Sequence, residues 1–218
     1  LSYYYIVDLF GKGVLVNDEN FNTPTPLPES NRKQLFEFVE SELKAIEEML
    51  PPTNTYGRAN KSAARTLLAK LYLNAEVYTG TKRYDDAATY LNKVITEGGY
   101  SLEGNYRLNF STDNNTSKEI IFPLIADALT SQSFGNTTYI IQGSVSTDTM
   151  TPSNYGIVGP TEGAWAGHRA TKAWYGLFAG NANQLASSTD TRAHLFWTTG
   201  QNWEMTDYKE WTDGYPSI

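Results

Sequence analysis

The sequence predicts a mainly α-helical protein whose helical scaffold is followed by a loop-rich second half carrying short strands. Apolar residues recur at helical spacing in several segments before residue 100. After residue 110 the apolar runs become short, and Gly, Asn and Thr separate them. All five tryptophans also lie in this second half. We therefore divide the 218-residue chain into a helical scaffold at 1–109 and a loop-rich region at 110–218.

The chain opens with an apolar segment at 1–10 that ends at Gly11. A glycine closes a helix readily in the left-handed conformation, so this segment is predicted to be the end of a helix. Prolines then occupy every second position at 24, 26 and 28. Because proline fixes φ and lacks the backbone donor, an extended connector is expected at 22–30.

An amphipathic helix is predicted at 31–50, ended by Pro51-Pro52. Its apolar stripe has helical spacing and consists of Leu35, Val39, Leu43, Ile46 and Leu50. Its other face carries Lys44 and a cluster of acidic residues, namely Glu40, Glu42, Glu47 and Glu48. Such a cluster resembles a metal site in composition, but on one helix it is expected to be a solvated face.

Two further helices are predicted at 60–79 and 84–97, with Asn60 and Gly80 as caps of the first. Small alanines on both helices allow close approach, which favours an antiparallel hairpin. The spacing Leu68-Ala69-x-x-Tyr72 and then Ala87-Ala88-x-x-Leu91 is typical of tetratricopeptide-like units. The scaffold is therefore interpreted as a tetratricopeptide-like helical repeat that is incomplete on its N-terminal side.

The second half offers weaker signals. Short apolar runs at 119–125 and 137–141 predict strands. Segment 171–178 predicts a short helix whose Trp174, Leu177 and Phe178 face inward. Asp190 and Arg192 are expected to form an ion pair or loop clasp.

Composition excludes several functional classes. The net charge of −7 argues against nucleic acid as a partner, and the absence of cysteine excludes disulfides and thiolate chemistry. No stretch is long and apolar enough to predict a membrane span. Neither a cofactor nor a metal site is expected. His168 beside Arg169 is not expected to act as a general base, because no positioned partner is evident. A glycosidase needs a facing pair of carboxylates, and no recognisable barrel strand presents one.

The aromatic residues of the second half are the candidate binding groups. Trp197 and Trp203 flank a polar stretch, and Tyr155 lies between polar residues and glycine. Aromatic planes stack on the C–H faces of sugars, while polar side chains bind the hydroxyls. Ordinary packing is the alternative for each of these rings, because tryptophan is highly buried on average. Arg169 is expected to serve as a hydrogen-bond donor, structural or to ligand.

The order of several motifs resembles the SusD/RagB family. They begin with Tyr3-Tyr4-Tyr5-Ile6-Val7-Asp8-Leu9-Phe10-Gly11 and the proline-rich link, and continue with Arg58-x-x-Lys61-x-Ala63-Ala64-x-x-Leu67-Leu68-Ala69-x-Leu71-Tyr72-Leu73-Asn74. Tyr84-Asp85-x-Ala87, Gly99-Tyr100-x-Leu102 and Glu119-Ile120-Ile121-Phe122 follow in order. The resemblance covers about residues 1–125 and reappears at 163–171, a stretch that contains Trp165 and Arg169.

This resemblance implies a non-catalytic protein that captures an oligo- or polysaccharide at the surface of the bacterial outer membrane. Its expected partner is a SusC-like TonB-dependent transporter, and its membrane contact is a lipid anchor in a missing N-terminal segment. The chain is accordingly interpreted as an internal fragment, with 110–218 as the ligand-binding region, incomplete at its C-terminal side. The expected ligand-binding residues are Trp197, Trp203, Tyr155, Trp165 and Arg169. A helical-repeat adaptor that binds a protein or peptide is the alternative.

Overall fold

The computed structural model describes residues 1–111, 113–125, 129–130, 139–140, 143, 165, 172–178 and 188–195. The chain separates into two compact units, Leu1–Leu124 and Ile125–Ile218. The sequence-based division at 109/110 falls inside the first unit, and its assignment of scaffold and ligand-binding roles stays a prediction.

The first unit begins with a short helical segment, as expected. Helix α1 (Ser2–Tyr5) continues into a π-helical turn at Ile6–Phe10. Gly11 ends this turn with φ at 72°, and its backbone N–H donates to the carbonyl oxygen of Ile6 at 3.0 Å. The predicted glycine cap is therefore confirmed.

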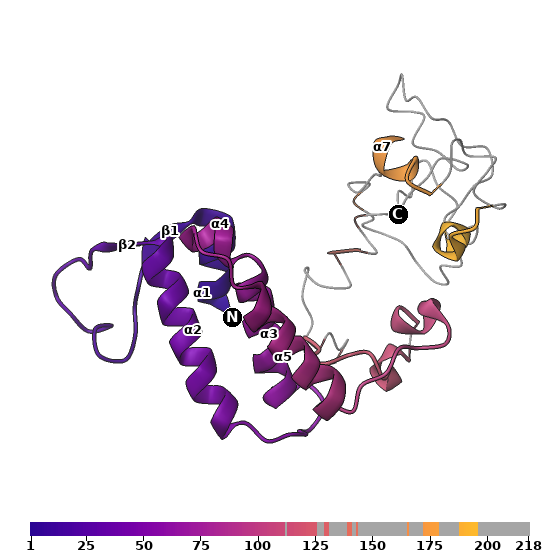
Figure 1. The fold of residues 1–218 in the computed structure, drawn as a ribbon, viewed down its shortest axis with the longest axis horizontal. Coiled ribbons are helices and arrows are strands. Elements are labelled where there is room, and N and C mark those ends of the chain that lie inside the picture. Colours follow the sequence, from indigo (N-terminus) through magenta and orange to yellow (C-terminus); the bar gives the residue numbers. More distant parts are fainter. Residues whose placement is uncertain are drawn as a thin grey trace. The chain divides into compact units, whose positions relative to one another are not determined.

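A two-stranded antiparallel sheet follows, which sequence analysis did not predict. Strand β1 (Lys12–Val14) pairs with β2 (Glu29–Asn31), and Gly13 lies opposite Ser30. In Figure 1 a long loop joins the two strands and contains the proline-rich connector. Strands of three residues are too short to show the alternation of apolar and polar residues from which strands are predicted. Each segment is a strand because it pairs with the other, and sequence periodicity cannot show such a distant pairing.

Helix α2 (Arg32–Met49) confirms the predicted amphipathic helix. Its N-terminus carries a capping box, in which the Asn31 side chain accepts from the Gln34 backbone and the Gln34 side chain accepts from the Asn31 backbone. The first three residues of the predicted apolar stripe are buried, whereas Ile46 is 40% exposed. The expectation of a solvated acidic face is wrong for Glu47, which is buried.

The next three helices are α3 (Lys61–Leu73), α4 (Ala75–Thr79) and α5 (Tyr84–Glu97). Both predicted caps are confirmed, since the Asn60 side chain accepts from the Ala63 backbone and Gly80 has φ at 80°. The single helix expected at 60–79 is interrupted at Asn74, which joins α3 to α4. Figure 1 shows α3 and α5 lying along each other, with α2 beside α3. The arrangement is mainly helical as predicted, and the tetratricopeptide-like repeat type stays a prediction.

The core of the first unit lies where these helices meet. Its largest fully buried side chains come from the opening turn, α2 and α3: Val7, Leu35, Leu68, Leu71 and Tyr72. Small residues such as Ala64, Ala75 and Ala87 complete the cluster. Burial of this apolar surface holds the helices in position.

Beyond residue 110, short strands were predicted, and none occurs in the part of the chain that the structure describes. Segment 119–125 is irregular, and Tyr139 and Ile140 are helical, so both strand predictions are wrong for their described residues. Short apolar runs fit a buried coil or helix as well as a strand. Of the described helices, none combines the length and apolar character that a membrane crossing requires.

Helix α7 (Lys172–Tyr175) confirms a short helix within the predicted segment. The Trp174 and Phe178 rings meet edge to face at a centroid distance of 5.1 Å, whereas Leu177 is 78% exposed rather than inward. The predicted clasp between Asp190 and Arg192 is confirmed, with Nη2 of the arginine 2.6 Å from Oδ2 of the aspartate.

Candidate functional site

Of the five predicted ligand-binding residues, Trp165 is the one among the described residues. Trp197, Trp203, Tyr155 and Arg169 lie outside them, so their roles stay predictions. Trp165 is 41% exposed. At this exposure part of its ring is open to a stacking partner.

Tyr139 accompanies Trp165. The ring centroids are 6.0 Å apart, with the ring planes tilted by 54°, and Tyr139 is 51% exposed. Two exposed rings in contact provide a wider apolar surface than either ring alone. Sequence analysis assigned Tyr139 to a strand and missed it as a candidate. Its aromatic character was visible, but its proximity to Trp165 depends on tertiary structure.

Two pockets are lined by described residues of the first unit. The larger, of about 710 Å³, lies along α2 and α3 and is lined mainly by apolar side chains, including Ile46, Leu67 and Phe122. The smaller, of about 220 Å³, lies beside the loop that precedes α3. Ile120 and Ile121 line both. The segment predicted to be a strand therefore serves instead as the shared wall of two pockets.

The smaller pocket has the more polar chemistry. Tyr56 and Arg58 line it from the loop, and Tyr100 lines it from the segment after α5. Tyr56 is 47% exposed. The Asn60 amide donates to the Tyr100 hydroxyl at 2.8 Å, which holds the tyrosine against the start of α3. The pocket thus combines aromatic rings, hydroxyl groups and a guanidinium.

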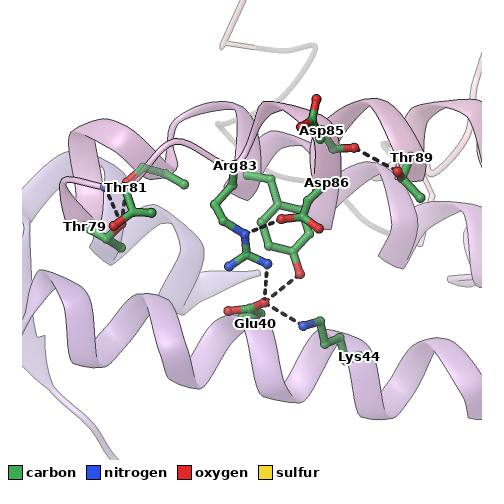
Figure 2. A network of polar contacts seen from close by, with 10 residues as sticks. Glu40, Lys44, Thr79, Thr81, Arg83, Asp85, Asp86 and Thr89 are labelled. Atoms are coloured by element: carbon green, nitrogen blue, oxygen red, sulfur yellow. Dashed lines mark hydrogen bonds and ion pairs between the residues drawn. The ribbon is translucent and has the colours of Figure 1, made fainter.

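The most extensive polar network described in the scaffold centres on Glu40 of α2 (Figure 2). Its Oε1 accepts hydrogen bonds from Lys44 at 2.7 Å, from the Tyr72 hydroxyl at 2.8 Å and from Arg83 at 3.2 Å. Arg83 also pairs with Asp86 on α5. One carboxylate therefore connects α2, α3 and the start of α5.

Burial and hydrogen bonding have opposite effects on the pKa of Glu40. Burial raises the pKa, but the hydrogen bonds from Lys44, Tyr72 and Arg83 outweigh it and lower the pKa below its usual value. The Tyr72 pKa is raised, first by burial and then by its hydrogen bond to the carboxylate. The Glu40 carboxylate is thus held ionised by its hydrogen bonds, which suits a structural role. A general acid, in contrast, must carry a proton to donate.

Comparisons with known proteins extend the sequence resemblance. No family model matches the chain. The starch-binding protein SusD of Bacteroides thetaiotaomicron is 39% identical over 149 residues, which make up 66% of this chain and 26% of SusD. A SusD-like protein of Bacteroides ovatus is 28% identical over 129 residues, or 56% of this chain and 24% of the relative.

The chain is also similar to parts of solved structures. A crystal structure with a xylogluco-oligosaccharide is 28% identical at a TM-score of 0.50, covering 56% of this chain and 26% of that one. A SusD-like protein of Bacteroides fragilis is 30% identical at a TM-score of 0.48, with 55% and 24% covered. The chain spans about a quarter of the length of the curated relatives it matches.

The fold and the comparisons place the chain in a class of mainly helical proteins built on a multi-helix scaffold. Within that class the chain is SusD-like, and the resemblance to the SusD/RagB family seen in its sequence is confirmed.

Proposed function

We propose that the protein captures glycans without cleaving them, at the surface of the bacterial outer membrane. Binding is by stacking on aromatic rings and by hydrogen bonds from polar side chains. The single observation that carries this proposal is the 39% identity to a starch-binding protein over two-thirds of the chain. The similar structure with a xylogluco-oligosaccharide supports the same class of ligand.

The described part of the second unit contains a pair of aromatic rings suited to stacking on a sugar. Trp165 and Tyr139 present adjacent exposed rings, and sugar rings offer C–H faces that pack on such surfaces. In this proposal Trp197, Trp203 and Tyr155 provide further stacking surfaces, and Arg169 binds hydroxyl groups. Capture needs no bond to break, so no catalytic residue is assigned.

The proposal also includes a destination for the glycan. A SusC-like TonB-dependent transporter receives it, and a lipid anchor keeps the binding protein at the outer membrane. Both elements come from the SusD-like character of the chain. Their test is co-purification of the full-length protein with a transporter from outer membranes, compared with a variant in which the lipid-accepting residue is replaced.

A second candidate function, binding of a protein partner, is favoured by one observation. Helix α5 carries an exposed apolar stripe at helical spacing, formed by Tyr84, Leu91 and Ile95, which are 48%, 44% and 72% exposed. Such a face is suited to packing against a helix of another protein. A helical-repeat adaptor would use this face rather than the aromatic rings of the second unit.

Affinity electrophoresis separates the two candidates. The full-length protein is run through gels that contain starch, xyloglucan or another neutral polysaccharide, alongside Trp197→Ala and Trp203→Ala. We expect one polysaccharide to retard the wild type, a tryptophan variant to be retarded less, and no shortened glycan to form. Absence of retardation by every neutral polysaccharide contradicts capture of neutral glycans at these aromatic residues and favours the adaptor.

A further inference from the structure

The small pocket beside the loop before α3 has the chemistry of a second, separate binding site. Its volume is about 220 Å³, and it lies wholly within the first unit, lined by residues of 53–60, 98–100 and 120–123. Pockets that hold drug-sized ligands have volumes of roughly 300 to 1,000 Å³. A pocket below that range fits a smaller group, such as one sugar ring.

The loop that forms one wall is held by its own hydrogen bonds. The Arg58 backbone N–H donates to the Thr55 carbonyl at 2.9 Å, and Gly57 between them has φ at 78°. A positive φ at this position of a turn favours glycine, and it leaves Tyr56 at the tip of the turn. Asn54 uses both ends of its amide inside the loop, accepting from Thr55 and donating to the Ala59 carbonyl. The turn therefore presents Tyr56 and Arg58 on a fixed backbone.

Charge is the feature that distinguishes this pocket. The protein has a net charge of −7, yet none of the described residues that line the pocket is acidic. Arg58 is exposed, and it forms no ion pair with a carboxylate of the described residues. Guanidinium binds carboxylate and sulfate groups through parallel hydrogen bonds, which makes Arg58 a suitable anion ligand.

The other groups of the lining suit a hydroxylated ring. The Tyr100 hydroxyl accepts from Asn60, so its own O–H is available to donate, and no acceptor for it occurs among the described residues. Tyr56 offers a half-exposed aromatic ring, and Ile120 with Ile121 provides an apolar wall. A ligand with one anionic group, several hydroxyls and apolar C–H faces matches all of these groups.

We propose that this pocket binds an anionic sugar residue, with Arg58 contacting its carboxylate or sulfate group and Tyr56 packing against its ring. This inference rests on the proposed capture of glycans and adds a class of sugar and a second place of contact. The aromatic residues of the second unit are a different set, so the two sites are separable by mutation.

Isothermal titration calorimetry of the full chain tests the proposal with three probes. Digalacturonic acid carries carboxylates, galactose 6-sulfate carries a sulfate, and galactobiose is neutral. We expect an acidic probe to bind and the neutral probe to bind at least about tenfold more weakly, because only the acidic probe accepts charge-assisted hydrogen bonds from the Arg58 guanidinium. Binding of digalacturonic acid alone assigns a uronate, and binding of galactose 6-sulfate alone assigns a sulfated sugar.

Matched variants locate the binding. Arg58→Gln is expected to weaken the binding of the acidic probe about tenfold. Arg107→Gln removes the same charge from an exposed arginine outside the pocket, and it is expected to leave the affinity unchanged. Tyr56→Ala should weaken binding, and Tyr56→Phe should retain it because the ring remains. Circular dichroism melts confirm that each variant is folded.

Each of three results overturns the proposal. They are no binding of either acidic probe, binding of the neutral probe as tight as that of the acidic probe, or equal losses of acidic-probe affinity in Arg58→Gln and Arg107→Gln. These results leave the proposed capture of glycans standing if a neutral polysaccharide still retards the protein in gels. Conversely, acidic-probe binding that depends on Arg58, together with no retardation by neutral polysaccharides, supports this pocket and contradicts the aromatic site.

Discussion

Glu47 of α2 and Arg65 of α3 form a buried ion pair, with Oε1 of the glutamate 2.7 Å from Nε of the arginine. Their side chains are 5% and 10% exposed. Arg65 also pairs with Glu97 at the end of α5, at 2.6 Å. A single guanidinium therefore connects three helices of the scaffold, and its contact with Glu47 lies where water cannot easily replace either side chain.

Glu47→Ala is expected to destabilise the protein by about 3 to 5 kcal/mol, because it leaves the Arg65 charge buried with only its partly exposed partner Glu97. Urea unfolding monitored by circular dichroism measures the loss. Glu48→Ala is the control, since Glu48 is the exposed neighbour on the same helix, and it should change stability by less than about 0.5 kcal/mol. Equal effects of the two substitutions contradict the structural role of the ion pair.

Stability should fall in acid partly through Glu40. Its pKa is lowered in the folded protein, so its contribution is complete above the unfolded pKa of about 4.3 and is lost as the pH falls through the lower, folded pKa. Glu40→Gln lacks this titration. The stability difference between wild type and Glu40→Gln should therefore shrink as the pH falls from 7 into this range.

Urea midpoints measured across that pH range check this prediction. Glu42→Gln is the control, because Glu42 is exposed on the same helix and has no hydrogen bond to a described residue. Its difference from wild type should stay small at every pH. If the difference in unfolding free energy between wild type and Glu40→Gln stays constant down to pH 3, the Glu40 pKa is not lowered in the folded protein.

Gly11→Ala should destabilise the protein more than Gly80→Ala. Both glycines have positive φ, 72° and 80°, where a side chain costs about 1 to 2 kcal/mol. A Cβ atom at Gly11 would also lie 2.6 Å from Nη2 of Arg32, whereas none of the described atoms lies within 4 Å of a Cβ at Gly80.

The additional cost at Gly11 has a specific origin. Arg32 lies over the Tyr78 ring, with its guanidinium carbon 5.8 Å from the ring centroid. Displacing it forfeits about 0.5 to 1 kcal/mol of cation–π attraction. Thermal melts of both variants, repeated in an Arg32→Ala background, measure this cost. The difference between the two glycine sites should largely disappear in that background, and its persistence would point to strain in the backbone alone.

Trp165→Ala is expected to weaken the binding of a captured glycan by about tenfold or more, in line with the loss of a central aromatic contact. Tyr139→Ala should weaken it as well, and Tyr139→Phe should not, if the ring rather than the hydroxyl makes the contact. Titration of the polysaccharide that retards the wild type provides the affinities. Trp174→Ala is the control, because that ring contacts Phe178. Unchanged affinity in Trp165→Ala removes this residue from the proposed site.

The helices were predictable because their signals are local. The cap Asn60, the closing glycines and Pro51-Pro52 act within a few positions of the chain, and apolar spacing within α2, α3 and α5 needs no distant partner. Predictions failed where a distant segment decided the outcome. The strand pair at Lys12–Val14 and Glu29–Asn31 is an example, because each strand exists through the other.

The candidate sites divide in the same way. Sequence reasoning identified tryptophans as binding groups from residue type, and four of the five predicted residues lie outside the described part of the chain. It did not find the pair of Trp165 with Tyr139, nor the pocket that Arg58 shares with Tyr100, because those residues are far apart in the chain. Residue type indicates which chemistry is available, whereas proximity determines where it is assembled.

The sequence by itself determined the helical class of this protein, the ends of α2 and α5 and its SusD-like character, because these depend on short-range patterns and on the order of motifs. Only the tertiary structure decided which charged residues became structural. Glu47 and Glu48 are adjacent glutamates on one helix, yet one is buried against Arg65 and the other is exposed. The physical reason is that a charge enters the interior only where a partner from another helix compensates its lost hydration, and no local pattern specifies that partner.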